Sequence, residues 1–222
     1  MQVRQSTNLD FTDLPVLVYQ QKNLCLLTVP NSGSHDEDFN NAYVLGRHFT
    51  SALIERLSED DTLDESKSKI SEVAKGILNV CPQGGIQFAL LMQRNDELWI
   101  LSCGSTYVID FAQGEPTLAF PPQNLLHDTE DGKPALPEGA YIDEPRSFIP
   151  TTMLTAMTEA NIQSIVQPAG NSSLAVIVDG YIGEGILAQK VVFEDIGTFI
   201  TQSSFKTNPN RTFVSWHMPK TE

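Results

Sequence analysis

The fold is decided by the stretch Gly85-Ile-Gln-Phe-Ala-Leu-Leu-Met-Gln-Arg-Asn-Asp-Glu-Leu-Trp-Ile-Leu-Ser-Cys-Gly-Ser-Thr-Tyr-Val-Ile-Asp110. Its apolar runs at 86–93, 97–103 and 106–112 are separated by a polar turn and by Gly104-Ser105. Such runs between turn residues predict three consecutive strands of a meander. The runs are almost continuously apolar, which predicts antiparallel strands covered on both faces, as in one sheet stacked on another beneath helices.

The residues before this stretch predict a strand pair followed by two helices. Short apolar runs at 14–20 and 23–29 predict two strands joined by a turn. Apolar residues then recur at three- and four-residue steps over 39–57, which predicts an amphipathic helix. Thr62-Leu-Asp-Glu65 is a capping box, so a second helix is expected to begin there and to run to Leu78.

The residues after the stretch predict a mixture of elements. We expect a short strand at 117–120, a helix within 151–166 and a strong strand at 173–179. Residues 183–200 favour a helix, and 212–217 a last strand. The economical interpretation is one α+β domain over 1–179, with 180–222 as a C-terminal extension packed on it.

Composition narrows the classes of partner. The 222 residues are 41% apolar, with no run long enough to span a membrane and no apolar signal segment. Three widely spaced cysteines in apolar surroundings predict reduced thiols, so we expect a cytoplasmic protein. The net charge of −14 argues against a nucleic-acid partner and against docking on anionic lipid, and it favours solubility.

Four strings carry a resemblance to a known family. They are Arg4-Gln-Ser-Thr-Asn-Leu-Asp10, Leu24-Cys-Leu-Leu-Thr-Val-Pro-Asn-Ser-Gly-Ser34, Asn95-Asp-Glu-Leu-Trp-Ile-Leu-Ser-Cys-Gly-Ser-Thr-Tyr-Val-Ile109 and Asn171-Ser-Ser-Leu-Ala-Val-Ile-Val178. In the same order they resemble the opening Arg-x-x-Asn-Glu-Asp, the Val-Ala-Asp-Gly strand, the Gly-Asp-Ser-Arg hairpin and the terminal Asp-Asn strand of metal-dependent (magnesium/manganese, PPM-type) protein serine/threonine phosphatases. The resemblance covers 4–120 and 148–179. It implies a four-layer α-β-β-α sandwich of two mainly antiparallel sheets flanked by helices.

The sequence departs from that family where metal would bind. In the family, aspartates hold two or more divalent cations that activate a water for attack on phosphorus, and such cations need several carboxylate ligands. The corresponding positions here are neutral: Asn31, Ser105, Thr151 and Asn171. Tyr107 stands where the family has an arginine. The resemblance therefore implies a degenerate member that holds no metal and does not catalyse.

An enzymatic alternative depends on the acids that remain. Arg4 and Asp10 match the family's phosphate-binding and acidic positions, and Asp36 and Asp38 lie in an acidic loop beside Asn31. With Asp179, these residues would rebuild a magnesium or manganese site in a divergent phosphoprotein phosphatase. The simpler interpretation of the acidic loop is a solvated segment that favours the positive end of the first helix.

The preferred function is a protein-binding or regulatory module. By the resemblance, a catalytically inactive member binds a kinase, a phosphoprotein or a related regulator, and a homo-oligomer is compatible with the sequence. Aromatic residues of the C-terminal extension, Phe205, Phe213 and Trp216, are candidates for the partner surface. A third interpretation is an N-terminal-nucleophile hydrolase, which would need processing to free a Thr or Ser amine.

Overall fold

The computed structural model describes residues 2–4, 15–21, 23–31, 38–128, 149–157, 161–170, 172–202 and 213–217. They form two five-stranded antiparallel sheets with flanking helices, which confirms the predicted α+β fold. The chain divides into two compact units: a first unit of 1–10, 104–151 and 167–222, and a second unit of 11–103 and 152–166. None of the helices in the described ranges is long and apolar enough to cross a membrane.

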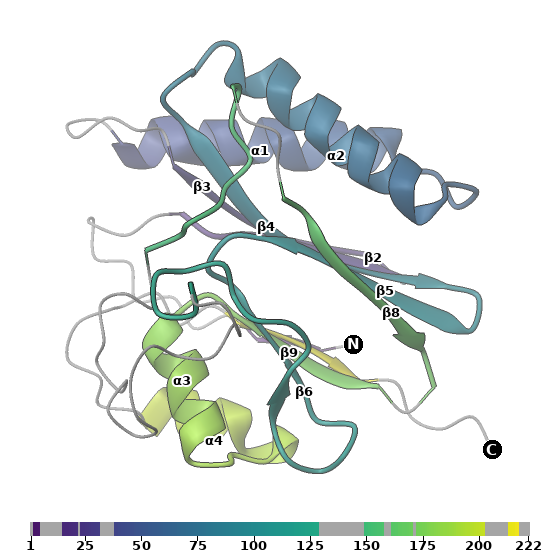
Figure 1. Cartoon of the computed structure of the whole chain (residues 1–222), viewed down its shortest axis with the longest axis vertical. Coiled ribbons are helices and arrows are strands. Elements are labelled where there is room, and N and C mark those ends of the chain that lie inside the picture. Colours follow the sequence, from purple (N-terminus) through teal and green to yellow (C-terminus); the bar gives the residue numbers. More distant parts are fainter. Residues whose placement is uncertain are drawn as a thin grey trace. The chain divides into compact units, whose positions relative to one another are not determined.

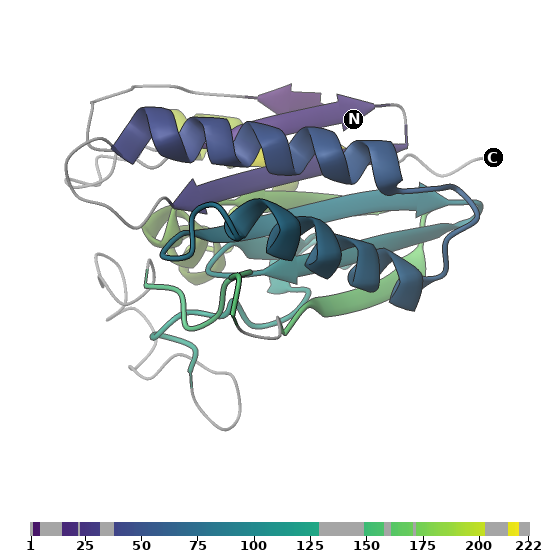
Figure 2. The same ribbon diagram turned by 90° about the horizontal axis from the view of Figure 1, so that it is seen from above.

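In the second unit, two helices cover one face of a sheet (Figure 1). The sheet has the order β2 (Leu17–Gln21), β3 (Leu24–Asn31), β4 (Gly85–Arg94), β5 (Glu97–Cys103) and β8 (Gln163–Pro168). The helices are α1 (Asp38–Arg56) and α2 (Leu63–Leu78), which lie side by side above the strands (Figure 2). Their predicted apolar stripes are buried against the sheet, with Phe49 and Phe88 at the centre of the core.

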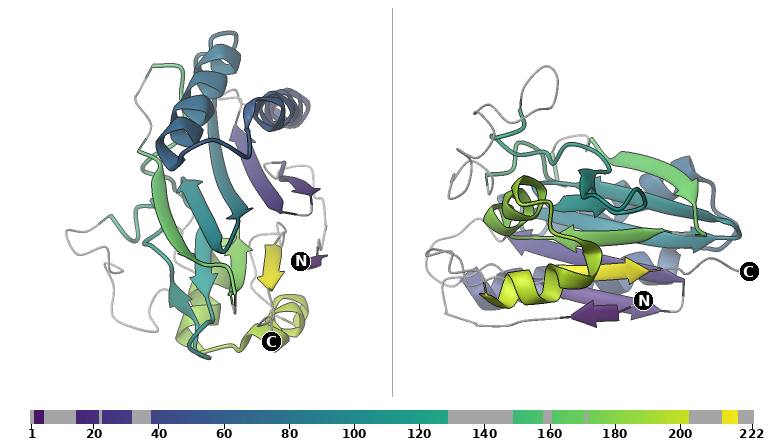
Figure 3. Two further views of the ribbon diagram at one scale, coloured as in Figure 1. Left: turned by 90° about the vertical axis from the view of Figure 1, so that its right-hand side faces the viewer. Right: turned by 90° about the horizontal axis from the view of Figure 1, so that it is seen from below.

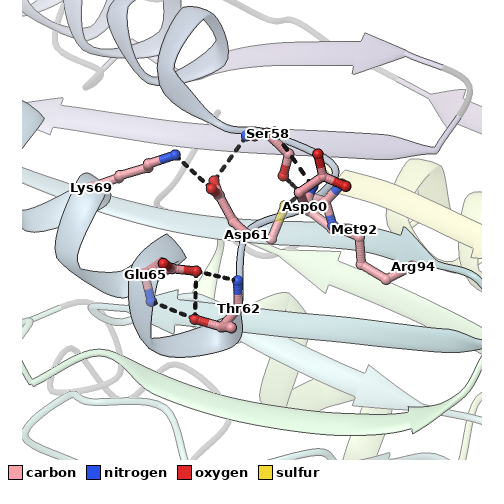
Figure 4. Close-up of polar contacts among 8 residues, drawn as sticks. All are labelled: Ser58, Asp60, Asp61, Thr62, Glu65, Lys69, Met92 and Arg94. Atoms are coloured by element: carbon pink, nitrogen blue, oxygen red, sulfur yellow. Dashed lines mark hydrogen bonds and ion pairs between the residues drawn. The ribbon is translucent and has the colours of Figure 1, made fainter.

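The predicted capping box at the start of α2 is present. Thr62 N donates to Glu65 Oε2 at 2.8 Å, and Glu65 N donates to Thr62 Oγ1 at 3.2 Å (Figure 4). Two amides that the first helical turn would leave without a partner are thereby satisfied, so the helix begins where the sequence predicts.

The first unit contains the other sheet and the C-terminal helices. Its strand order is β1 (Gln2–Arg4), β10 (Phe213–His217), β9 (Ser173–Ile177), β6 (Tyr107–Asp110) and β7 (Thr117–Leu118). Helices α3 (Gly180–Ala188) and α4 (Ile196–Gln202), joined through the 3₁₀ helix η2 (Phe193–Asp195), pack on one face of this sheet (Figure 3). The predicted helical character of 183–200 is thus confirmed, although it is divided among α3, η2 and α4. The predicted last strand is confirmed as β10.

The predicted meander is wrong in its third strand. β4 and β5 form a hairpin, whereas β6 pairs with β9 and β7 in the other sheet. The chain changes sheet at Gly104, whose φ of 115° lies in the left-handed region that glycine adopts without strain. An apolar run buried on both faces fits an inner position of either sheet, so the sequence pattern does not distinguish them.

The predicted helix at 151–166 is also wrong. Leu154 forms an isolated bridge to Ile86, with Leu154 N donating to Ile86 O at 2.9 Å and Ile86 N donating to Leu154 O at 3.0 Å. Residues 163–168 then form β8 beside β5. Pairing with strands from a distant part of the sequence overrides the weak local helical pattern here.

Candidate functional site

Ser105 lies in the connection at which the chain leaves β5 and enters β6. Its side chain is buried, and the neighbouring backbone is held by Gln123. Gly104 N donates to Gln123 Oε1 at 2.9 Å, and Gln123 N donates back to Gly104 O at 3.0 Å. This reciprocal pair fixes the Ser105 turn against the segment that follows β7.

The same glutamine brings Thr151 into this neighbourhood. Thr151 N donates to Gln123 O at 2.9 Å, so Gln123 joins the Ser105 turn and the Thr151 segment within the first unit. Two of the four predicted degenerate metal positions are therefore close in structure although 46 residues apart in the sequence (151 minus 105). Both contribute a neutral hydroxyl group, and the Thr151 side chain is exposed.

A buried polar network lies under this turn, and we name it the Tyr107 network. It consists of Tyr107 on β6, Asn124 and His127 in the segment after β7, and Glu184 on α3. Tyr107 Oη donates to Glu184 Oε1 at 2.7 Å and accepts from Asn124 Nδ2 at 3.1 Å. His127 Nε2 lies 2.6 Å from the same Glu184 oxygen, and His127 N donates to Asn124 Oδ1 at 3.0 Å.

The burial of the Tyr107 network determines its electrostatics. Exposed fractions are 0% for Tyr107 and Asn124, 4% for His127 and 1% for Glu184, which excludes direct contact with a substrate in this state. Burial, together with the charge of Glu184 and the hydrogen bond to it, raises the pKa of Tyr107 well above its ordinary value. The phenol therefore stays protonated and acts as a hydrogen-bond donor rather than as a nucleophile.

The second buried acid of this unit, Asp179, caps α3. Its Oδ1 accepts from Tyr181 N at 2.9 Å and from Ile182 N at 3.1 Å. An acid at this position satisfies free amides and interacts favourably with the helix dipole. One turn later, a Cβ at Gly183 would lie 2.5 Å from Tyr107 Cγ, so α3 approaches β6 too closely for any larger residue.

A second polar site lies in the second unit, around the connection between α1 and α2. Ser58 N and Lys69 Nζ donate to Asp61, at 2.8 and 2.6 Å, and Arg94 Nη2 donates to Ser58 O at 2.6 Å (Figure 4). Burial raises the pKa of Asp61, but these hydrogen bonds and the nearby positive charges outweigh it, so the pKa lies below its ordinary value. Arg94 also stacks over Trp99, with 5.9 Å between Cζ and the ring centroid.

These contacts border a pocket of about 600 Å³. Four of its lining residues are acidic, Glu59, Asp61, Asp96 and Glu97, and Arg94 is the basic residue among those described. Arg94 links the β4–β5 hairpin to the connection between α1 and α2 through its hydrogen bond to Ser58 O. The pocket therefore has a structural role and an acidic surface that favours cationic groups.

No protein-family model and no curated protein matches this sequence. Solved structures do match. MsPP, a PPM Ser-Thr phosphatase from Mycobacterium smegmatis in complex with cacodylate, aligns with a TM-score of 0.72 at 7% identity over 96% of this chain and 95% of that chain. The serine/threonine phosphatase PstP/Ppp of Mycobacterium tuberculosis gives 0.70 at 14% identity over 98% and 97%. The catalytic domain of PstP with two manganese ions gives 0.65 at 13% identity over 96% and 94%.

The chain has the fold of the PPM-type serine/threonine phosphatases. This confirms the fold that the sequence strings imply. At such low identities the likeness extends to the fold alone, so the chemistry of this PPM-like chain has to be judged from its own residues.

The described residues of the PPM-like chain do not fit a two-metal site. Magnesium and manganese require several oxygen ligands, including carboxylates. Ser105 and Thr151 supply neutral oxygens, while Glu184 and Asp179 are engaged in the Tyr107 network and in the α3 cap. Within the described ranges, no group of three or more His, Cys, Asp and Glu side chains is placed to hold a metal ion.

The remaining predicted site residues are placed in part. Asn31 is the last residue of β3, opposite Gly85 of β4 in the second unit, and is half-buried. The backbones of Arg4, Asp38, Phe213 and Trp216 lie in β1, α1 and β10, whereas their side chains lie outside the description. Four residues lie wholly outside the described ranges: Asp10, Asp36, Asn171 and Phe205. These positions remain predictions.

The Tyr107 network is not predicted from the sequence. His127 is not among the residues that the sequence singles out, yet its ring is buried and contacts the Tyr107 ring edge-on, with centroids 5.8 Å apart. One signal was available. Glu184 is the single charged residue in the run Tyr181-Ile-Gly-Glu-Gly-Ile-Leu187, and a lone acid on an apolar helix face requires a buried partner.

Proposed function

We propose that this chain uses the PPM-like fold as a non-catalytic, protein-binding or regulatory module. The observation that carries this proposal is the linkage of the neutral residues Ser105 and Thr151 through Gln123. It lies in a unit whose buried acids, Glu184 and Asp179, are engaged in structural hydrogen bonds. In a working metal site, carboxylates would face the cations instead.

The buried network also supports a rigid scaffold. A polar cluster whose members satisfy one another stabilises a unique arrangement of the elements that contribute them. Here it joins β6, the segment after β7, and α3, in the same unit as Ser105 and Thr151. A scaffold of this kind suits recognition, because a preorganised surface loses little conformational entropy on binding.

The proposed partner is a kinase, a phosphoprotein or a related regulator, as the resemblance implies. The net charge of −14 and the acidic pocket beside Trp99 favour basic segments of such a partner. Binding through these surfaces should weaken as salt concentration rises, because exposed charge pairs are screened.

Mn²⁺ calorimetry followed by hydrolysis of p-nitrophenyl phosphate tests the proposal. The full chain should show no Mn²⁺-dependent hydrolysis above a protein-free control, with PstP of Mycobacterium tuberculosis as the positive control in the same buffer. Tight Mn²⁺ binding with hydrolysis, both lost in Asp10→Ala, would instead establish the alternative, a divergent metal-dependent phosphoprotein phosphatase with a rebuilt site.

Cross-linking in the native cells tests the second part of the proposal, that the chain binds a protein partner. A specific protein partner should be recovered with the wild-type chain and equally with Asp10→Ala, because binding does not need the metal-site acid. Recovery that requires Asp10 and Mn²⁺ would contradict a non-catalytic module.

A further inference from the structure

The predicted metal position Asn31 has a glycine as its neighbour in the sheet of the second unit. Asn31 ends β3 and pairs with Gly85, the first residue of β4. Directly opposed residues of an antiparallel pair point to the same face, with their Cβ positions about 5 Å apart. The adjacent residues Pro30 and Ile86 face the helices, so Asn31 and Gly85 lie on the face that is turned away from α1 and α2.

The side chain of Met153 lies over Gly85 on this face. A Cβ at Gly85 would stand 2.9 Å from Met153 Cε, 3.1 Å from its Sδ and 3.4 Å from its Cβ. The backbone at Gly85 does not itself require glycine, because its φ lies outside the left-handed region. Glycine within a strand weakens the strand and marks a place where another group approaches closely. The missing side chain therefore makes room for the whole length of Met153 beside Asn31.

The backbone next to Met153 is fixed on the edge of β4. The last residue of β5, Cys103, pairs with Phe88, so the edge of β4 at Ile86 is available to another segment. Leu154 takes that place with two backbone hydrogen bonds to Ile86, of 2.9 and 3.0 Å. The Leu154 side chain is buried in the core under the helices, whereas Met153, immediately before it, points to the opposite face. The bridge thus determines where Met153 lies.

We propose that Met153 is a built-in plug, whose thioether chain fills the place beside Asn31 that a hard divalent cation and its water would need. Magnesium and manganese prefer oxygen ligands, and a methionine sulfur is soft and uncharged. The position is therefore closed by packing and not only by the loss of a carboxylate. This inference rests on the proposed function, because the resemblance to the phosphatases is what places a metal ligand at position 31.

Thermal melts of a double-mutant cycle on the full chain test the plug. Asn31→Asp alone places a carboxylate beside the thioether, where it is partly removed from water, so it should lower Tm by roughly 3–6 °C. In a Met153→Ala background water reaches the new carboxylate, and Asn31→Asp should cost less than about 1 °C. Met157→Ala is the matched control, because Met157 is 82% exposed in the same segment, and Asn31→Asp should keep its full cost there.

Addition of Mn²⁺ to the same melts is the second measurement. At about 10 mM, Mn²⁺ should raise the Tm of the double variant Asn31→Asp/Met153→Ala, whose carboxylate is accessible, and leave that of Asn31→Asp unchanged. An equal cost of Asn31→Asp in all three backgrounds, or the same Mn²⁺ response in both variants, would overturn the plug while leaving the proposed function standing. Mn²⁺-dependent hydrolysis by the wild type would instead contradict the proposed function, whatever the melts show.

Discussion

Removal of one oxygen atom from Tyr107 should destabilise the first unit. Tyr107→Phe keeps the ring that packs against α3 at Gly183 and edge-on against His127. It deletes the hydroxyl that donates to Glu184 Oε1 at 2.7 Å and accepts from Asn124 Nδ2 at 3.1 Å. The change leaves the packing intact, so the loss in stability measures the polar contacts.

The expected magnitude follows from the burial of both partners. A hydrogen bond to a charged group contributes about 1.5–3 kcal/mol, and a buried donor that loses its acceptor costs about 1–3 kcal/mol. His127 still lies 2.6 Å from Glu184 in the variant, so the carboxylate keeps one strong contact. We therefore expect a loss of about 3 kcal/mol, which lowers Tm by roughly 6–12 °C for a chain of this size.

Urea denaturation and thermal melts at neutral pH measure this loss. Tyr43→Phe is the matched control, because Tyr43 is 43% exposed on α1, and it should change stability by less than about 0.5 kcal/mol. The double variant with Glu184→Gln should reveal a coupling energy of about 1–3 kcal/mol. If Tyr107→Phe and Tyr43→Phe have the same urea midpoint and Tm, or if the coupling energy is zero, the network does not stabilise the unit as described.

Three further changes have directions that follow from the structure. Gly183→Ala should lower the free energy of unfolding in urea by about 1–3 kcal/mol, because its Cβ would lie 2.5 Å from Tyr107 Cγ. The cost of this overpacking outweighs the better helix propensity of alanine. Thr62→Ala should cost about 1 kcal/mol by removing the α2 cap, and Thr62→Ser should restore most of that loss in the same assay. Burial raises the pKa of Cys25 and of Cys103 from 9.0 to about 12. Above pH 9 the thiols ionise in the unfolded chain while they stay protonated in the folded chain, which favours unfolding. The free energy of unfolding should therefore fall by roughly 2–3 kcal/mol per thiol by about pH 11. Under reducing conditions, Cys25→Ala should show a shallower fall with pH.

Local signals account for α2 and for the β4–β5 hairpin of the second unit. The stripe ending at Leu78 and the Thr62–Glu65 box predict α2, because helix periodicity and capping depend on residues three and four apart. The hairpin of β4 and β5 is equally local, with Asn95 at φ 53° in its turn. In these places the interactions that stabilise the element come from the same short stretch.

The candidate site could be predicted only in part. The neutral residues at positions 31, 105 and 171 are evident from the strings that resemble the phosphatase family, and Thr151 lies in the range 148–179 that the resemblance covers. The meeting of Tyr107, His127 and Glu184 is not evident in this way, because it joins a strand, a loop and a helix up to 77 residues apart. No periodicity links such positions, and burial of the histidine depends on how α3 packs.

The sequence by itself determined the order and type of most elements, the capping of α2 and the neutrality of the predicted metal positions, because each is a property of residue type or of short-range spacing. Only the tertiary structure decided that the chain changes sheet at Gly104, that β8 replaces a predicted helix, and that Glu184 is engaged with Tyr107 and His127. These outcomes depend on which strand edge and which buried partner are available in space. That competition between distant segments is settled by packing and hydrogen bonding, not by local propensity.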